Sequence, residues 1–353
     1  MSYTLNKKII ELEPYDPISG TYDIRLDANE CPVNLPDDIK QQIKKLIDDI
    51  DFNRYPDPLA EKLINSFADY YEIKPELVTA GNGSDELIFL IESAFLEKGD
   101  KMLVVSPDFS MYQFYSSICE VECDTFYKND SLDIDVDKLI DTVNSKQIKL
   151  LLFSNPCNPT GRGITADEAR RIVSSTDCLV ILDEAYMDFW NQSLIHEVEK
   201  YSNLIIFRTA SKSIGSASLR LGFAVANKTI SKAIKAVKSP YNVNSISQAI
   251  GEVIYQNKEY LQNRQKVIVN NRKKLYNGLI EIAKQYSDFT VYESVANFVF
   301  VKTKASKQIW EYLKNQSIVI RLMGEYLRIT AGTEYEVEQT LRAINELFTE
   351  VKE

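Results

Sequence analysis

Histidine is almost missing from this chain: His196 is the only one among 353 residues. The five cysteines contain no Cys-x-x-Cys pair. Because structural zinc sites are built mainly from cysteine and histidine, the sequence predicts no metal centre, and we expect the thiols to be reduced. Proton transfer in any reaction must then fall mainly to Lys, Asp, Glu or Tyr side chains.

Basic charge and long apolar runs are also scarce. The 41 Lys and Arg residues against 51 Asp and Glu give a formal charge of -10 at pH 7, which disfavours nucleic acids and anionic membranes as partners. No apolar run approaches the roughly 20 residues of a membrane span. The opening "MSYTLNKKII" lacks the apolar core and cleavage site of a signal peptide. We therefore predict a cytoplasmic protein with no nucleic-acid and no membrane partner.

Three common catalytic and nucleotide-binding motifs are absent as well. The sequence contains no GxxxxGK[ST], no GxGxxG and no GxSxG. These absences argue against a P-loop ATPase, a dinucleotide-binding fold and a hydrolase with a serine at a nucleophile elbow.

What the chain does contain is an alternation of apolar runs and helical stretches between about residues 76 and 226. The runs are "MLVV" (102–105), "IKLLLF" (148–153), "CLVIL" (178–182), "LIIF" (204–207) and "GFAVA" (222–226). Continuous runs are typical of strands buried on both faces of a mostly parallel sheet. With intervening helices such as 84–95 and 165–175, they predict an α/β fold with helices on both sides of the sheet.

The pattern changes near residue 240. Two amphipathic helices are predicted over 245–256 and 259–284, followed by strands of a smaller sheet and a closing helix whose start carries Thr333 and Glu336 in capping-box spacing. We predict an N-terminal arm (1–30), a large domain (31–240) and a small α+β C-terminal domain (241–353).

Unusual polar residues stand directly after three of the predicted strands. Asn155 and Asn158 follow the run 148–153, Asp183 and Tyr186 follow 178–182, and Lys212 follows 204–207. Ligands of open parallel sheets bind beyond the carboxyl ends of the strands. We therefore expect these side chains to share one site.

A fourth segment, "GNGSDE" (81–86), places Gly83, Ser84 and Asp85 at a helix start, where backbone N–H groups and the helix dipole can hold a phosphate. Each piece also has a simpler interpretation. Ser and Asp are ordinary helix caps, "NPTG" (158–161) is a common proline turn, and most lysines are solvated. Only their shared position at strand ends favours a site.

Pyridoxal phosphate would use all of these groups. It needs a lysine for a Schiff base, an anion cradle and a carboxylate against its pyridine nitrogen. Lys212 would anchor the aldehyde and Asp183 would face the ring nitrogen. The predicted phosphate contacts outside the helix start are Thr209, Ser211 and Arg220.

The order of short motifs resembles a known family. The motifs are "LDANE" (26–30), "NRYPDP" (53–58), "GNGSDELI" (81–88), "NPTG" (158–161), "DEAY" (183–186), "RTASK" (208–212), "LRLGF" (219–223), "ANFVFV" (296–301) and "LRITAGT" (327–333). Together, over about residues 22 to 340, the chain resembles the histidinol-phosphate aminotransferase group of fold-type-I pyridoxal-phosphate enzymes. The resemblance implies a large cofactor-binding domain with a mostly parallel sheet.

The resemblance also implies a role for individual residues. The implied catalytic residues are Lys212, Asp183 and Tyr186. The implied cofactor contacts are Gly83, Ser84, Asp85, Phe109 stacked on the ring, Asn158 and Tyr186 at O3′, Thr209, Ser211, Arg220, and Tyr55 reaching the neighbouring subunit's cofactor in a homodimer. The implied substrate contacts are Arg321, Arg328, Tyr15 and Asn297. Paired guanidinium groups suit a phosphate or a carboxylate.

The resemblance therefore predicts an aminotransferase that exchanges an amino group between glutamate or 2-oxoglutarate and a small phosphorylated amine or ketone, in amino-acid biosynthesis. Departures such as "GSASLR" (215–220) and "NECPVNLP" (29–36) lie near the substrate. Two alternatives stay open: transamination of another phosphorylated ketone, such as dihydroxyacetone phosphate to serinol phosphate, and decarboxylation of a phosphorylated amino acid. The similar threonine-phosphate decarboxylases usually carry an HGGN-like segment near the N-terminus. The corresponding region here, "EPYDPISGTYD" (13–23), has no histidine, so the resemblance favours transamination.

Overall fold

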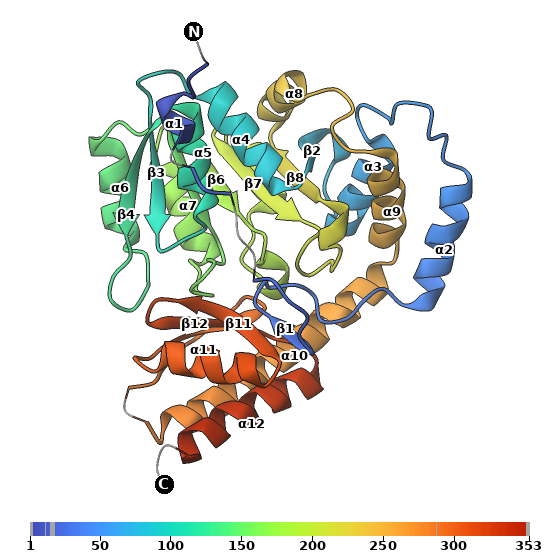
Figure 1. Cartoon of the computed structure of the whole chain (residues 1–353). Helices are drawn as coiled ribbons and strands as arrows, with labels where there is room; N and C mark the ends of the chain where they lie inside the picture. Colours follow the sequence, from blue (N-terminus) through green and yellow to red (C-terminus); the bar gives the residue numbers. More distant parts are fainter. Residues whose placement is uncertain (1–2, 11, 15–17, 287, 351–353) are drawn as a thin grey trace.

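Two β-sheets, each with its own apolar core, organise the chain (Figure 1). The computed structural model describes residues 3–10, 12–14, 18–286 and 288–350. The larger sheet has seven strands, in the spatial order β2 (Val78–Asn82), β8 (Leu221–Ala226), β7 (Leu204–Thr209), β6 (Leu179–Asp183), β5 (Leu150–Ser154), β3 (Lys101–Ser106) and β4 (Glu122–Tyr127). The predicted α/β fold is thus confirmed.

The large sheet is buried on both faces. Leu151 and Phe153 of β5 point into one apolar core, whereas Leu150 and Leu152 of the same strand point into the other. The first core is covered by α3 (Glu61–Tyr71), α6 (Val136–Ser145), α7 (Ala166–Ser174) and α9 (Ser245–Gln256). The second is covered by α4 (Ser84–Phe95), α5 (Met111–Cys119) and α8 (Lys228–Val237). The period-2 alternation of strand side chains explains why apolar residues run continuously in these strands.

One strand of the large sheet runs against the others. The strands β3 to β7 pair in parallel, but β8 is antiparallel to both β7 and β2. Parallel neighbours need a crossover that returns the chain to the opposite edge of the sheet, whereas residues 210–220 join the antiparallel strands β7 and β8 at one edge. This loop, which carries Lys212, stays at the carboxyl end of β7 and places Arg220 at the same edge of the sheet.

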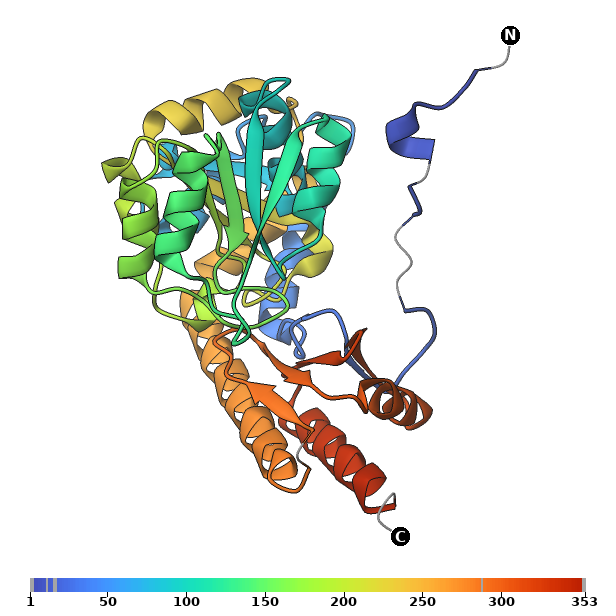
Figure 2. The same ribbon diagram turned by 90° about the vertical axis from the view of Figure 1, so that its left-hand side faces the viewer.

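The smaller sheet has five strands, in the order β1 (Ile24–Leu26), β11 (Ile318–Met323), β12 (Tyr326–Thr330), β10 (Phe298–Lys302) and β9 (Thr290–Tyr292). Figures 1 and 2 show it lying between the large sheet's part of the molecule and three helices, α10 (Lys258–Ala283), α11 (Ser306–Asn315) and α12 (Glu334–Glu350). The predicted capping box forms at the start of α12, where Thr333 N donates to Glu336 Oε2 at 2.6 Å and Glu336 N donates to Thr333 Oγ1 at 3.3 Å.

The N-terminal region contributes more to this sheet than the sequence indicates. Strand β1 falls within the predicted arm, yet it pairs in parallel with β11, and Ile24 and Leu26 are buried in the small core. Upstream, α1 (Lys7–Ile10) runs beside the body (Figure 2), and Lys8 Nζ donates to Ile118 O at 2.9 Å. The division into arm, large domain and small domain at residues 30 and 240 stays a prediction.

The remaining helices are short or peripheral: α2 (Asp37–Asp48) and the 3-10 helices Pro75–Leu77, Met187–Phe189, Ile195–Lys200 and Ala217–Leu219. Within the described ranges, none of the helices combines the length and the apolar character that crossing a bilayer requires.

Candidate active site

The carboxyl ends of β5, β6 and β7 bring the predicted polar residues to one edge of the large sheet. Asp183 is the last residue of β6 and pairs in register with Ser154 at the end of β5. Asn155, the first residue of the loop after β5, donates its N–H to Asp183 O at 2.9 Å. Lys212 lies in the loop after β7. The parallel arrangement of these strands is what gathers the segments.

Asp183 is a buried carboxylate held by two donors. Tyr112 OH donates to its Oδ2 at 2.8 Å, and Ala185 N donates to its Oδ1 at 3.0 Å. Burial raises the pKa of Asp183 from 3.8 to about 6, although both hydrogen bonds act to lower it. A carboxyl of this kind can either carry a negative charge or hold a proton near neutral pH.

Lys212 meets the segment that precedes the large sheet. Its Nζ donates to Ala28 O at 3.1 Å and lies 5.8 Å from the centroid of the Tyr186 ring. Tyr186 OH in turn accepts a hydrogen bond from Asn29 Nδ2 at 3.0 Å. Amine, phenol and amide therefore lie together around residues 28 and 29.

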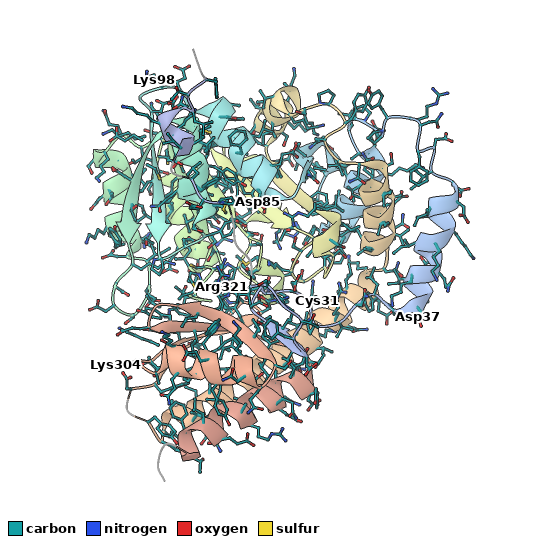
Figure 3. All side chains as sticks on the ribbon, in the orientation of Figure 1. Cys31, Asp37, Asp85, Lys98, Lys304 and Arg321 are labelled. Atoms are coloured by element: carbon teal, nitrogen blue, oxygen red, sulfur yellow. The ribbon has the colours of Figure 1, made fainter. Side chains whose placement is uncertain are left out.

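A cradle for an anion lies at the start of α4. Gly83 has φ = 84°, and a Cβ added there would lie 2.9 Å from Arg220 Nη2. The register of β2 and β8 explains this neighbourhood, because Asn82 pairs with Leu221. Arg220 Nη2 also donates to Asp85 Oδ2 at 3.2 Å, so the Asp85 carboxylate orients the guanidinium group beside the helix start. Figure 3 shows Asp85 at this helix start.

The two hydroxyls of "RTASK" lie beside this cradle. Thr209 pairs with Gly222, and a Cβ on Gly222 would lie 2.4 Å from Ser84 N. Thr209 Oγ1 donates to Ser211 Oγ at 3.0 Å and accepts from Ser211 N at 3.1 Å. The predicted phosphate contacts are thus brought together by strand register, although they are far apart in sequence.

Two arginines face each other on the small sheet. Arg321 of β11 and Arg328 of β12 are directly paired. Arg328 donates to Asn158 Oδ1 and to the carbonyl oxygen of Asp27, which connects the small sheet to the loop after β5. The Arg321 guanidinium group has no hydrogen bond or ion pair with any residue that the structure describes. It lies at the junction between the two sheets (Figure 3).

Other predicted contacts fall at different distances from this centre. Asn297 is fully buried and donates from Nδ2 to Asn29 O at 3.1 Å. Phe109 packs edge-on against Tyr112, with ring centroids 5.5 Å apart. Tyr55 is 81% exposed and stacks on Tyr241, with ring centroids 4.6 Å apart. Tyr15 lies outside the described residues.

Sequence reasoning missed three contributors. Tyr112 donates a hydrogen bond to Asp183, and Asn29 donates one to Tyr186. Arg208 is the third: this buried side chain forms ion pairs with Glu184 at 2.8 Å and Asp188 at 2.6 Å. Their sequence signals were weak: Asn29 stands inside the motif "LDANE" and Arg208 opens the motif "RTASK", whereas Tyr112 belongs to none of the motifs given above.

The Arg208 cluster fixes the loop that carries the lysine. Asp188 accepts a hydrogen bond from Ser213 Oγ, next to Lys212, as well as from the guanidinium group. Tyr71 OH donates to the same carboxylate at 3.0 Å. Because buried charges are tolerated only when they are paired, this cluster ties the loop that carries Lys212 to the segment after β6.

These groups fit pyridoxal phosphate. The cradle at Gly83 leaves room that a Cβ would fill beside a guanidinium group, as a bound phosphate requires. Asp183 is buried and able to face a pyridine nitrogen, and Lys212 supplies the amine. The cofactor would be held by Arg220, Thr209 and Ser211 at its phosphate and by Asp183 at its ring.

Comparisons with known proteins identify the family of this chain. The family model for aminotransferase class I and II matches residues 21–344. A histidinol-phosphate aminotransferase of Clostridium novyi (strain NT) is 39% identical over 344 residues, which are 96% of this chain and 95% of that protein. A histidinol-phosphate aminotransferase of Caldanaerobacter subterraneus subsp. tengcongensis (strain DSM 15242 / JCM 11007 / NBRC 100824 / MB4) is 35% identical over 351 residues, covering 98% of this chain and 99% of that protein.

Solved structures share the fold. The histidinol-phosphate aminotransferase of Sinorhizobium meliloti in complex with pyridoxal-5'-phosphate superposes with a TM-score of 0.84 at 20% identity, covering 94% of this chain and 92% of that chain. The L-threonine-O-3-phosphate decarboxylase of Porphyromonas gingivalis gives 0.78 at 20% identity, with coverage of 92% and 99%. Such likeness does not separate transamination from decarboxylation. The family model and the full-length relatives do: this chain belongs to the class I and II aminotransferase family and is a pyridoxal-phosphate-dependent transaminase.

Proposed function

We propose that this enzyme exchanges an amino group between glutamate or 2-oxoglutarate and histidinol phosphate or its ketone, imidazole-acetol phosphate. The observation that carries the proposal is the pair Arg321 and Arg328, which adjoins the lysine site through residues 27 and 28. Among the described residues the Arg321 guanidinium group has no hydrogen-bond or ion-pair partner. Two arginines suit a substrate phosphate in one half-reaction and a glutamate carboxylate in the other. The relatives that are 35–39% identical over nearly the whole chain are histidinol-phosphate aminotransferases.

The chain's own residues have distinct tasks in this proposal. When bound, pyridoxal phosphate withdraws electrons from the carbon that bears the amino group, so that its proton becomes acidic. In the first half-reaction the Lys212 amine removes that proton. In the second half-reaction it returns a proton to the corresponding carbon of the acceptor. The Asp183 carboxylate would stabilise the protonated pyridine nitrogen of the cofactor. Tyr186 and Asn158 would contact its O3′ oxygen. Arg328 holds the anionic end of the substrate while bonded to Asn158.

We also propose a homodimer in which Tyr55 contacts the phosphate in the neighbouring subunit. Its side chain is 81% exposed in a single chain and stacks on Tyr241, which is 42% exposed. Large exposed aromatic side chains that lie close together commonly mark an interface.

A role for the remaining predicted substrate residue, Asn297, is consistent with its contact to Asn29 O. The cytoplasmic location stays a prediction.

A half-reaction without an acceptor tests the substrate. Cofactor-loaded enzyme would be mixed separately with L-histidinol phosphate, serinol phosphate, phosphoserine and glutamate, while visible absorbance of the lysine-bound cofactor and release of carbon dioxide are followed. We expect rapid loss of absorbance with histidinol phosphate and with glutamate, without carbon dioxide. Lys212→Ala serves as the control and should show neither the absorbance nor turnover.

Other outcomes would redirect the proposal. Loss of absorbance with glutamate and serinol phosphate, but not with histidinol phosphate, would move the enzyme to another phosphorylated ketone. Carbon dioxide released from phosphoserine without any added keto acid would contradict transamination and favour the decarboxylase.

A further inference from the structure

A lysine and a cysteine meet outside the catalytic centre. Lys128 follows β4, and Cys157 lies in the loop after β5, one residue before Asn158. The distance between Lys128 Nζ and Cys157 Sγ is 2.8 Å. N–H···O bonds are commonly about 2.9–3.0 Å long, and sulfur is larger than oxygen, so this nitrogen–sulfur contact is closer than an ordinary hydrogen bond.

Both side chains are held in place by one carbonyl group. Lys128 Nζ donates to Pro107 O at 2.9 Å, and Cys157 Sγ donates to the same oxygen at 3.3 Å. Cys157 is only 2% exposed, and Lys128 is half-buried. Lys128 forms no ion pair with a carboxylate in the part of the chain that the structure describes. The amine is therefore directed at the sulfur by its surroundings.

We propose that Lys128 and Cys157 form a covalent nitrogen–oxygen–sulfur bridge when the protein meets dioxygen. The gap between the two atoms is too wide for a direct nitrogen–sulfur bond, but it suits a single bridging oxygen atom. A cavity of about 10 Å³ adjoins the pair and is lined by Ser154, Arg162 and Cys157 among others. A cavity of that size is just large enough for about one water molecule.

The reaction balances with dioxygen as the sole oxidant. The S–H bond and one N–H bond break, and an N–O and an O–S bond form. Nitrogen and sulfur each lose two electrons, and dioxygen takes up all four. One oxygen atom enters the bridge and the other leaves as water with the two hydrogens. Two molecules of a dithiol reductant supply the four electrons that reverse the change. The bridging oxygen then leaves as water, and the free amine and thiol are restored.

The bridge has a structural consequence for the active site. It would tie the end of β4 to the loop that presents Asn158, the acceptor of the hydrogen bond from Arg328. A cross-link lowers the entropy of the unfolded chain, so the bridged protein should unfold at a higher temperature than the reduced protein. The inference stands on the geometry of this pair and does not depend on which phosphorylated substrate the enzyme uses.

Peptide mapping by mass spectrometry tests the bridge. Holoenzyme would be reduced with dithiothreitol without air and then divided, with one half exposed to air-saturated buffer. We expect the oxidised half to yield a cross-linked pair of peptides containing residues 128 and 157, heavier than their sum by one oxygen atom minus two hydrogens. Renewed dithiothreitol should remove it. The oxidised wild type should also show a higher Tm.

Matched variants assign the atoms. Cys157→Ser and Lys128→Gln should each lose the cross-link and the oxidation-dependent Tm shift. Cys178→Ser, which removes another buried thiol, and Lys146→Gln, which removes a lysine bonded to Asp124 at 2.9 Å, should keep both. Absence of the cross-linked peptides from oxidised wild type would overturn the proposal whether or not the variants fold. So would a cross-link that lacks the oxygen atom.

Discussion

Asp183 is a single buried carboxyl group whose protonation depends on its neighbours. Its pKa is raised to about 6 by burial, while the hydrogen bond from Tyr112 opposes the rise. In the unfolded chain the same group titrates near 3.8. A raised folded-state pKa means that ionising the group costs folding free energy. The stabilising contribution is complete below about pH 4 and is lost as the pH rises through about 6.

We therefore predict that the apoenzyme's free energy of unfolding falls between pH 4 and pH 7 by an Asp183-dependent amount. A shift of about two pKa units corresponds to about 3 kcal/mol as an upper bound. Urea unfolding at several pH values measures it, with Asp183→Asn as the variant that cannot titrate. Tyr112→Phe removes the opposing hydrogen bond, so the decline should extend to higher pH. Superimposable pH profiles for wild type and Asp183→Asn would contradict this assignment.

At the scale of residues, sequence reasoning locates groups that directly follow a strand and misses their partners. Asp183 and Lys212 stand out because a charged side chain follows a buried apolar run. Tyr112 and Asn29 do not stand out, because their partners are distant in the sequence. Tyr112 lies 71 positions from Asp183, and Asn29 lies 157 positions from Tyr186. Contacts of that range depend on strand order and register, which a single sequence leaves undetermined.

The start of α4 is the element that holds the anion in our proposal. Gly83 combines φ = 84° with a close approach to Arg220, whereas Gly99 has φ = 97° and nothing within 4 Å of an added Cβ. Both glycines therefore impose a similar backbone penalty on alanine, about 1–2 kcal/mol. Only at Gly83 does the methyl group also meet a guanidinium group.

We predict that Gly83→Ala weakens retention of pyridoxal phosphate by about 10- to 100-fold, the equivalent of one charged hydrogen bond. Gly99→Ala should leave retention unchanged while lowering stability by a similar amount. Equilibrium dialysis of the cofactor, with circular dichroism to compare the folds, measures both. Equal losses of retention in the two variants would mean that backbone strain alone is responsible.

The same helix buries a carboxyl group that the active site does not use. Glu92 is fully buried, and neither of its oxygens has a hydrogen-bond partner among the described residues. Burial raises its pKa from 4.5 to about 8. Because the folded-state value is the higher one, stability is greatest below about pH 4.5 and is lost as the pH rises through about 8.

We expect Glu92→Gln to flatten this part of the pH dependence and to be more stable than wild type at pH 9. The amide imitates the protonated acid in shape and cannot ionise. The gain is on the order of a few kcal/mol, from about 1.4 kcal/mol per pKa unit. Thermal unfolding between pH 5 and pH 9 measures it, with the exposed Glu97→Gln as control. A wild type whose Tm does not fall relative to Glu92→Gln would refute the prediction.

At the scale of elements, continuous apolar runs predict the central strands well, and less regular segments escape. The edge strand β4 was missed because "ECDTFY" has no such run and is only partly buried. The reversed direction of β8 was not predictable from "GFAVA", since an apolar run is the same in either direction. Strand β1 is three residues long and becomes a strand only because β11 pairs with it.

The whole molecule supplies one site from three parts of the chain. Residues 27–29 accept from Lys212 and Arg328 and donate to Tyr186, so they join the large sheet to the small one. Tyr55 is the predicted contributor that a single chain leaves outside, stacked on Tyr241 with ring centroids 4.6 Å apart. If the proposed dimer is correct, each complete site combines Lys212 of one subunit with the other subunit's Tyr55.

Mixed dimers test this arrangement. One subunit would carry Lys212→Ala and the other Tyr55→Ala, each with a different affinity tag so that only mixed dimers are purified. In such a dimer one site has lost both groups and the other retains both. We predict about half of the wild-type turnover, because a twofold-symmetric dimer has two equivalent sites.

Homodimers provide the comparison that makes the result decisive. Lys212→Ala homodimers should be inactive, and Tyr55→Ala homodimers should bind the cofactor about tenfold more weakly, as expected for one lost hydrogen bond to a phosphate. The control is a mixed dimer of one Lys212→Ala subunit and one Tyr335→Ala subunit, where Tyr335 is another exposed tyrosine. Both of its sites keep Tyr55 and one keeps Lys212, so it should also show half of the wild-type activity. The mixed dimer should therefore match this control in cofactor affinity. If it instead retains the weak affinity of the Tyr55→Ala homodimer, then Tyr55 acts within its own subunit.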